Sequence, residues 1–171
     1  MNDTSSRLMR GVGTLLTALI VLNIVCAVMF AGIIVGSFLW GGTILRALAD
    51  DPANRSPAAV LQAMRIVMLI GLLMVPLAHL LLTRLRAIVA TVQAGDPFVA
   101  ANARRLTGIA WALLGIQIVD LGFGIVSMSM GAEELPWTFT LTGWLAVLLL
   151  FVLARVFEHG TRMRDELAAT V

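Results

Sequence analysis

The stretch GIAWALLGIQIVDLGFGIV, residues 108–126, is almost entirely apolar and carries one carboxylate, Asp120, near its middle. A helix needs about 20 consecutive apolar residues to cross a bilayer, and this stretch approaches that length. Three other stretches are also long and apolar. The sequence therefore predicts an all-α polytopic membrane protein with four transmembrane helices in a bundle. We expect a single integral membrane domain over residues 1–171, with helices at about 11–40, 57–94, 97–130 and 137–165.

The composition supports this class of protein and argues against several others. Hydrophobic residues make up 60% of the 171 residues and charged residues 13%, which is more apolar surface than a soluble domain of this size can bury. The net charge of only +2 argues against direct nucleic-acid binding. Cys26 is the only cysteine, so we expect neither an intramolecular disulfide nor a thiolate zinc cluster. P-loop, HExxH and GxSxG motifs are absent, so we expect no enzyme activity, metal or cofactor.

The distribution of arginine predicts the orientation of the chain in the membrane. Arginines gather before the first helix, between the second and third helices and after the fourth, whereas the loops on the other side are richer in acidic residues. The positive-inside rule then places both termini in the cytoplasm and makes the lipid bilayer the first expected partner. Residues 41–55 are expected to form a polar outer loop, and Ser56 and Pro57 to begin the second helix.

The segment LRAIVATVQAGDPFVAANARRL, residues 85–106, predicts a cytoplasmic helical hairpin between helices 2 and 3. Gly95 suits the left-handed cap of one helix, and Asp96 with Pro97 suits the N-cap and first residue of the next. The hairpin would project roughly 15 Å from the membrane, at about 1.5 Å per residue. It is either a solvated turn with arginines at the lipid headgroups or a docking site for a cytoplasmic partner. The docking residues would be Gly95, Asp96, Pro97, Phe98, Asn102, Arg104 and Arg105.

A stretch that overlaps this segment resembles the central motif of a bacterial family of four-helix inner-membrane proteins, domain of unknown function two-nine-seven-five. The stretch is AGDPFVAANARRLTGIAW, residues 94–111. The C-terminal RVFEHGTRMRDELAATV, residues 155–171, resembles the ending of the same family. Members are often encoded beside a small helix-turn-helix regulator, so the resemblance implies a membrane partner of a transcription factor. The matching residues of the central motif are Gly95, Pro97, Phe98, Asn102, Arg105 and Leu106.

Four polar side chains fall inside the predicted spans, namely Asn23, His79, Gln117 and Asp120, and all lie within about two helical turns of the midplane. An isolated Asp at the centre of a span costs about 2.5–3.5 kcal/mol on insertion scales. Asp120 therefore either stays protonated and hydrogen-bonds to Asn23 or Gln117, or pairs with protonated His79. We interpret this polar cluster as a clasp between helices. The alternatives are a proton-coupled site or substrate pathway, and a water-filled crevice.

Regularly spaced glycines predict close helix packing. Gly108, Gly115 and Gly122 recur every seven residues, and Gly32 with Gly36 forms a GxxxG motif. Small residues allow helices to approach closely, either within the bundle or between copies of the first helix in a homo-oligomer.

These features favour a non-enzymatic membrane regulator or scaffold that presents the hairpin to a cytoplasmic protein. By resemblance, that protein is a helix-turn-helix regulator. The alternative is a small oligomeric transporter or channel unit that uses Asp120 and His79.

Overall fold

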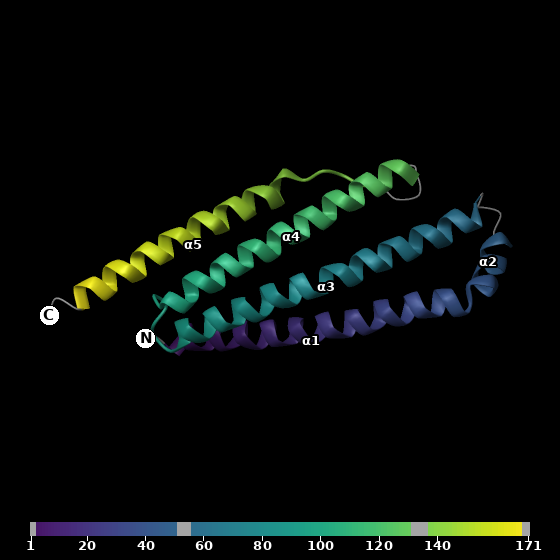
Figure 1. Ribbon diagram of the computed structural model, residues 1–171. Coiled ribbons are helices and arrows are strands. Elements are labelled where there is room, and N and C mark those ends of the chain that lie inside the picture. The colour runs from purple at the N-terminus through teal and green to yellow at the C-terminus, as the bar shows by residue number, and fades with distance from the viewer. Residues whose placement is uncertain (1–2, 51–55, 131–136, 169–171) are drawn as a thin grey trace. The chain divides into compact units, whose positions relative to one another are not determined.

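The computed structural model describes residues 3–50, 56–130 and 137–168, and these residues form helices joined by short connections (Figure 1). The described residues contain no strand, so the predicted all-α class is confirmed. The predicted outer loop between the last two spans, with Glu133 and Glu134, lies largely outside the described residues. The helices are α1 (Asp3–Leu39), α2 (Gly41–Ala49), α3 (Pro57–Gln93), α4 (Ala100–Met130) and α5 (Leu141–Ala168).

Four of these helices are long and apolar enough to cross a membrane, as predicted. Large apolar side chains remain exposed along them; Leu148 and Leu149 on α5, for example, are 63% and 68% exposed. Such a surface is unfavourable in water but matches the hydrocarbon of a bilayer, where a helix also satisfies its own backbone hydrogen bonds. The spanning segments are Leu8–Leu39, Pro57–Gln93, Ala100–Met128 and Leu141–Arg164.

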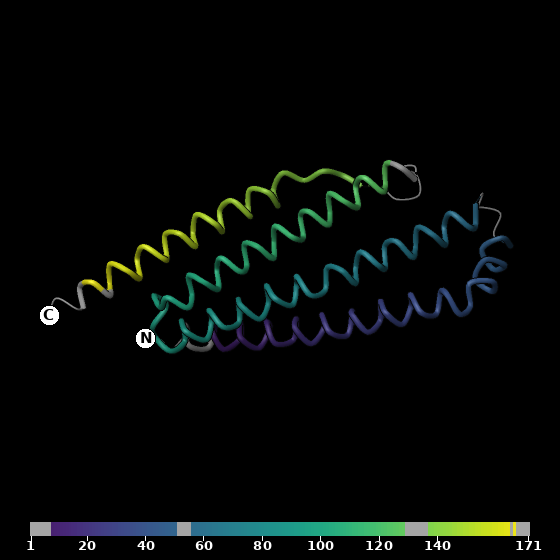
Figure 2. The backbone as a smooth tube through the Cα atoms, viewed as in Figure 1, coloured from purple at the N-terminus to yellow at the C-terminus, as the bar shows by residue number. Residues whose placement is uncertain are grey.

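Residues 41–49, predicted to be part of a polar loop, form the short helix α2, so that prediction is wrong. The backbone leaves the α1 helix at Trp40, where φ is −111° and ψ is 21°, and the tube turns sharply there (Figure 2). The Trp40 carbonyl then accepts the amide hydrogens of Thr43 and Ile44, both at 3.0 Å. Ile44, Leu45 and Leu48 have helical spacing. The glycines at positions 41 and 42 are weak helix formers and conceal this pattern.

The last two long helices begin later than predicted. α4 begins at Ala100 rather than at Pro97, and α5 begins at Leu141 rather than at Trp137. Before α4, the Asn102 amide N–H donates to the Val99 carbonyl at 2.8 Å, and its side chain binds the Pro97 carbonyl at 2.8 Å. These hydrogen bonds hold residues 97–99 in a non-helical conformation. Pro57, by contrast, begins α3 as predicted, since proline is tolerated in the first helical turn.

The chain packs as two compact units. The first unit comprises Met1–Leu22, Leu77–Gln117 and Thr140–Val171, and the second comprises Asn23–Pro76 and Ile118–Phe139. Along α3 the boundary falls at Pro76, a proline inside the helix. Each unit is described by itself below.

Small residues form much of the core of the first unit. Ala110 and Ala112 on α4 are 0% and 1% exposed, and Ala154 on α5 is 4% exposed. Alanine at these positions allows the helices to pack closely. On the same pair of helices, the rings of Trp111 and Phe151 meet edge to face, with centroids 5.4 Å apart.

In the second unit, aromatic side chains pack on glycines. The Phe30 ring on α1 lies against Gly71 on α3, where a Cβ atom would come within 2.8 Å of the ring. Trp137 likewise covers Gly124 on α4, at 2.6 Å from the position of a Cβ atom. These glycines therefore give the aromatic rings the room they occupy.

Candidate functional site: the cytoplasmic hairpin

A tight turn ends α3 and begins the hairpin. Gly95 has a φ of +85°, in the left-handed region that glycine adopts without strain, so its predicted role as a cap is confirmed. Its amide N–H donates to the Val92 carbonyl, and the Asp96 amide N–H donates to the Thr91 carbonyl, both at 3.1 Å. This pair of hydrogen bonds is the Schellman motif, and it satisfies carbonyls that a helix end would otherwise leave unpaired.

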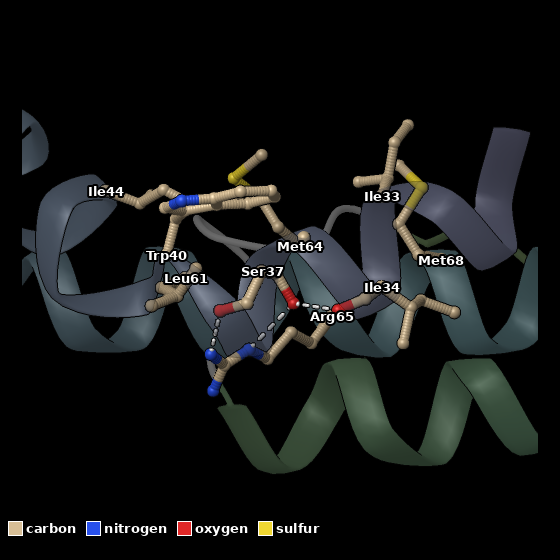
Figure 3. Close-up of a pocket in the computed structure, with 10 residues that line it drawn as sticks. Ile33, Ile34, Ser37, Trp40, Ile44, Leu61, Met64, Arg65 and Met68 are labelled. Carbon is tan, nitrogen blue, oxygen red and sulfur yellow. Dashed lines mark hydrogen bonds between the residues drawn. The ribbon is translucent and has the colours of Figure 1, made fainter.

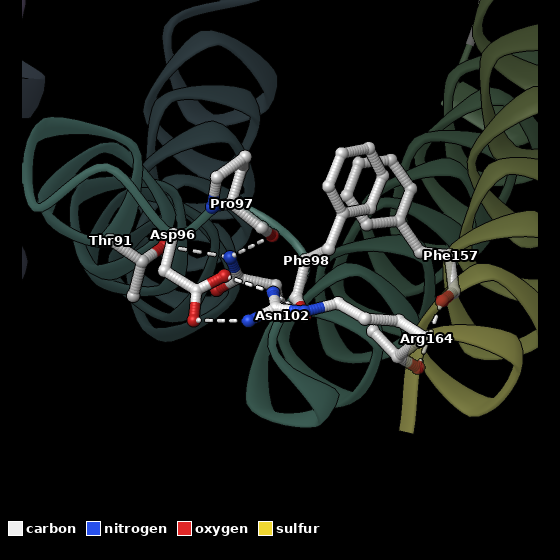
Figure 4. A network of polar contacts seen from close by, with 8 residues as sticks. Thr91, Asp96, Pro97, Phe98, Asn102, Phe157 and Arg164 are labelled. Atoms are coloured by element: carbon white, nitrogen blue, oxygen red, sulfur yellow. Dashed lines mark hydrogen bonds and ion pairs between the residues drawn. The ribbon is translucent and has the colours of Figure 1, made fainter. Parts of the chain in front are cut away.

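Asn102 is the centre of the hairpin and is 0% exposed. Its Nδ2 atom donates to Thr91 Oγ1 at 2.6 Å and to the Pro97 carbonyl at 2.8 Å (Figure 4). Its Oδ1 atom accepts from Arg105 Nη1 at 2.8 Å. Thr91 in turn donates to the Ile88 carbonyl at 2.7 Å. Because a buried amide is costly unless it is hydrogen-bonded, this side chain fixes the end of α3, the turn and the start of α4 in one arrangement.

Two contacts connect the turn to the end of α5. The Arg164 guanidinium forms an ion pair with the Asp96 carboxylate, with Nη2 at 3.3 Å from Oδ2, and it also donates to the Phe98 carbonyl at 3.1 Å. The rings of Phe98 and Phe157 stack with centroids 5.4 Å apart and an interplanar angle of 22° (Figure 4). Residues predicted to contact a partner thus hold the hairpin against another helix of the same unit.

The carboxylate of Asp96 does not cap α4, since that helix begins at Ala100, so its predicted role as an N-cap is wrong. Instead, the hydrogen bond from Arg164 lowers the pKa of Asp96 below its ordinary value. Burial opposes this shift in part, and the positive charge of Arg164 and a backbone hydrogen bond from Phe98 add to it. Both side chains are about half exposed, so the ion pair positions α5 more than it stabilises the fold.

Three arginines near the hairpin have different environments. Arg105 binds Asn102 and reaches the Ala87 carbonyl at 3.4 Å. Arg84 lies across Gly108, where a Cβ atom would come within 2.1 Å of its Nη1 atom. The side chain of Arg104 is exposed, and only its backbone carbonyl takes part, as the acceptor for Arg84 at 3.3 Å. Phe98 is 50% exposed. Of the predicted docking side chains, Phe98 and Arg104 therefore remain available at the surface.

The predicted polar cluster is divided between the units, with His79 and Gln117 in the first and Asn23 and Asp120 in the second. The Oδ1 atom of Asn23 and the Nε2 atom of Gln117 are buried and have no hydrogen-bond partner among the described residues. Within the described part of its own unit, Asp120 likewise has no hydrogen-bond or ion-pair partner. The clasp between helices stays a prediction.

The predicted packing glycines differ in their surroundings. Gly108 and Gly115 face side chains of α3, and a Cβ atom built on Gly115 would lie 3.1 Å from Leu77. A Cβ atom at Gly36 would meet only Trp40. Gly32 and Gly122 have nothing within 4 Å of a Cβ position. Sequence analysis missed three glycines at close helix contacts, because no regular spacing marks them. They are Gly71, Gly124 and Gly143, and a Cβ atom built on Gly143 would lie 2.3 Å from Gln117 Nε2.

The outward-facing part of the hairpin differs in chemistry from its hydrogen-bonded interior. Among the described residues, no group of three or more His, Cys, Asp or Glu side chains lies close enough to hold a metal ion. Basic and apolar side chains are exposed around the turn and at the end of α5. They include Arg86, Phe98, Arg104, Arg162 and Met163, and the polar side chains of Gln93 and Glu166 are also exposed there.

Long apolar helices and a capped hairpin define a polytopic α-helical membrane protein. The family described as "Protein of unknown function (DUF2975)" matches residues 47–171, which is most of the chain, and the protein belongs to this family. The match confirms the resemblance seen in the hairpin motif. No curated protein and no solved structure gave a match.

Proposed function

We propose that this protein is a non-enzymatic membrane regulator or scaffold of the bacterial inner membrane, which presents the α3–α4 hairpin and the end of α5 to a cytoplasmic protein. The observation that carries the proposal is the fully buried Asn102 network, together with the Arg164 contacts to the turn. These interactions make one rigid surface from segments distant in the sequence. A preformed surface binds a partner with a smaller loss of conformational entropy than a mobile loop does.

Helix length supports a hairpin that extends beyond the lipid. α3 has 37 residues, so it is roughly 55 Å long, whereas the hydrocarbon core of a bilayer is about 30 Å thick. Its apolar run ends near Thr83, and Arg84 and Arg86 follow directly. The rest of α3 and the turn therefore lie at or beyond the headgroups, on the side that the arginine distribution assigns to the cytoplasm.

The charges of the hairpin surface indicate the chemistry of the partner. Two acidic side chains of this surface are engaged by arginines, Asp96 with Arg164 and Glu158 with Arg155 at 2.8 Å. Arg86 and Arg104 are exposed and have no ion-pair partner in the described part of the chain. An acidic surface complements them best. The family resemblance makes a helix-turn-helix regulator the first candidate to examine for such a surface.

Site-specific photo-crosslinking in intact cells tests this proposal. We expect a cross-linker that replaces Arg104 to capture one cytoplasmic protein, whereas a cross-linker that replaces Leu148, a lipid-exposed residue of α5, captures no such protein. The charge reversal Arg86→Glu should reduce capture from position 104, because the partner is expected to be acidic. Identical products from positions 104 and 148, or capture unaffected by Arg86→Glu, would contradict the proposed docking surface.

A further inference from the structure

The second unit contains a pocket of about 370 Å³ between α1, α2 and the first part of α3 (Figure 3). Its walls are almost entirely apolar, and the lining residues with polar groups are Ser37, Trp40 and Arg65. This volume lies within the range of small-molecule sites in proteins. The apolar lining includes Ile33, Ile34, Ile44, Leu61, Met64 and Met68.

Arg65 is held firmly, but only by neutral groups. Its Nε atom donates to Ser37 Oγ at 3.2 Å, and its Nη2 atom donates to the Ser37 carbonyl at 2.5 Å (Figure 3). Its guanidinium carbon also lies 4.3 Å from the centroid of the Phe38 ring. No carboxylate in the described ranges 3–50, 56–130 and 137–168 pairs with it. A guanidinium at the end of a membrane span that has no carboxylate partner keeps hydrogen-bond donors for an anion.

The geometry of these contacts leaves one edge of the guanidinium open. Ser37 occupies the edge formed by Nε and Nη2, so the fork formed by Nη1 and Nη2 has donors to spare among the five of an arginine. That fork matches two oxygens of a phosphate or carboxylate. Gly41, the first residue of α2, lies next to it, since a Cβ atom there would be 3.1 Å from Nη2. The positive end of the α2 dipole therefore adds to the charge of Arg65, and a bound anion would interact favourably with both.

The position of Arg65 along the helix indicates where that anion comes from. Arg65 directly precedes the apolar run 66–83 of α3, and Trp40 follows the last residue of α1. Charged and aromatic residues at the ends of apolar spans lie at the level of the lipid headgroups. The apolar part of the pocket continues from this level along Ile33, Ile34 and Met68. A ligand with an anionic head and a hydrocarbon chain satisfies both parts.

We propose that this pocket binds an anionic phospholipid, with its phosphate on the open fork of Arg65 and one acyl chain along the apolar wall. The lipid belongs to the leaflet at the α1–α2 end of the spans. Methionines at positions 64 and 68 are flexible enough to follow an acyl chain. This site is separate from the docking hairpin and does not depend on the proposed partner.

Native mass spectrometry of the full chain, purified in detergent and offered phosphatidylglycerol and phosphatidylethanolamine in equal amounts, tests the proposal. We expect one retained phosphatidylglycerol, preferred about tenfold because the charge-assisted contact is specific to the anionic head. Arg65→Gln should abolish this preference. Arg46→Gln is the matched control, because it removes the same charge from an exposed position on α2 outside the pocket and should leave the preference unchanged.

A second variant keeps the test decisive if Arg65→Gln folds poorly. Met68→Trp fills the apolar part of the pocket without removing the guanidinium, and we expect it to reduce lipid retention while the helicity and elution volume stay those of the wild type. Equal retention of the two lipids by the wild type would overturn the proposal. An undiminished preference in Arg65→Gln, or undiminished retention of phosphatidylglycerol in Met68→Trp, would also overturn it. So would thermal stabilisation by inorganic phosphate alone equal to that given by phosphatidylglycerol.

Discussion

The arginines of the hairpin and Arg65 beside the pocket differ in the groups that bind their guanidinium. At the hairpin, Arg105 binds a buried amide and Arg164 binds a carboxylate, so their charges and donors serve the fold. In the second unit, Arg65 rests on the neutral oxygens of Ser37 and keeps a free edge. The difference teaches that an arginine indicates a ligand site only when no carboxylate of the protein occupies the fork of its guanidinium.

The largest expected effect concerns the interior of the hairpin. Replacing Asn102 by Ala removes three hydrogen bonds at a site with no access to water and leaves Arg105 and Thr91 without their partner. We expect a loss of about 2–3 kcal/mol in the free energy of unfolding. Thermal unfolding in detergent, followed by circular dichroism, measures it. Thr107→Ala is the control, because the Thr107 hydroxyl bonds only to the Ala103 carbonyl in its own helix. Equal stability of the two variants would show that the network is dispensable.

The second unit depends on packing rather than on polar contacts, and its glycines test this. A methyl group at Gly71 would come within 2.8 Å of the Phe30 ring, so we expect Gly71→Ala to lower the free energy of unfolding by about 1–3 kcal/mol.

Gly32→Ala is the matched change in open space, and the higher helix propensity of alanine should raise stability by roughly 0.5–1 kcal/mol. If Gly32→Ala instead destabilises the protein or dissociates an oligomer in a cross-linking assay, Gly32 packs against a second copy of α1.

A smaller effect is expected at the turn. Gly95 has open space around it, so Gly95→Ala introduces no clash but forces alanine into the left-handed region at φ +85°. We expect a loss of about 1–2 kcal/mol. Gly95→Asn should lose less, since asparagine tolerates this conformation better. The two variants compared by chemical denaturation separate backbone strain from packing, and equal losses would argue against strain.

The smallest effect is expected for the exposed contact between Asp96 and Arg164. Because the pKa of Asp96 is lowered in the folded protein, the contribution of this ion pair is present above the ordinary pKa of 3.8 and is lost as the pH falls through the lowered value. We therefore expect faster hydrogen exchange, corrected for intrinsic rates, at the end of α5 below about pH 4. Asp96→Asn should show this faster exchange at neutral pH.

Glu158→Gln, which breaks two ion pairs that both lie within α5, should leave hydrogen exchange at the end of α5 unchanged. If Asp96→Asn also leaves it unchanged, Phe98 and Phe157 suffice to hold α5 against the turn.

Hydrophobic run length predicted the class of fold and all four spans, because the bilayer imposes a length that a sequence displays directly. The break at Trp40 and the late start of α4 were not predictable in this way. The first depends on a single backbone conformation beside two glycines, and the second on the Asn102 side chain bonding to Pro97. Both are local hydrogen-bonding choices that hydropathy does not register.

The candidate site was predicted by residue, and its roles only in part. Gly95 was expected to cap α3 and does so. Phe98 and Asn102 were candidate docking residues, whereas Asn102 is buried and Phe98 stacks on Phe157. The contact with α5 joins positions more than 50 residues apart, which spacing within one segment does not reveal. Sequence analysis did not single out Arg65, because the pocket depends on α2, a helix that was predicted to be a loop.

The proline within α3 has a mechanical consequence. Pro76 has no amide hydrogen, so the carbonyl of Leu72 receives no helical hydrogen bond, and the elastic stiffness of the helix is lowest there. The boundary between the two compact units along α3 falls at this same residue. Bending of α3 therefore concentrates at one position, and neither the Asn102 network nor the Arg65 contacts need to deform when the helix flexes.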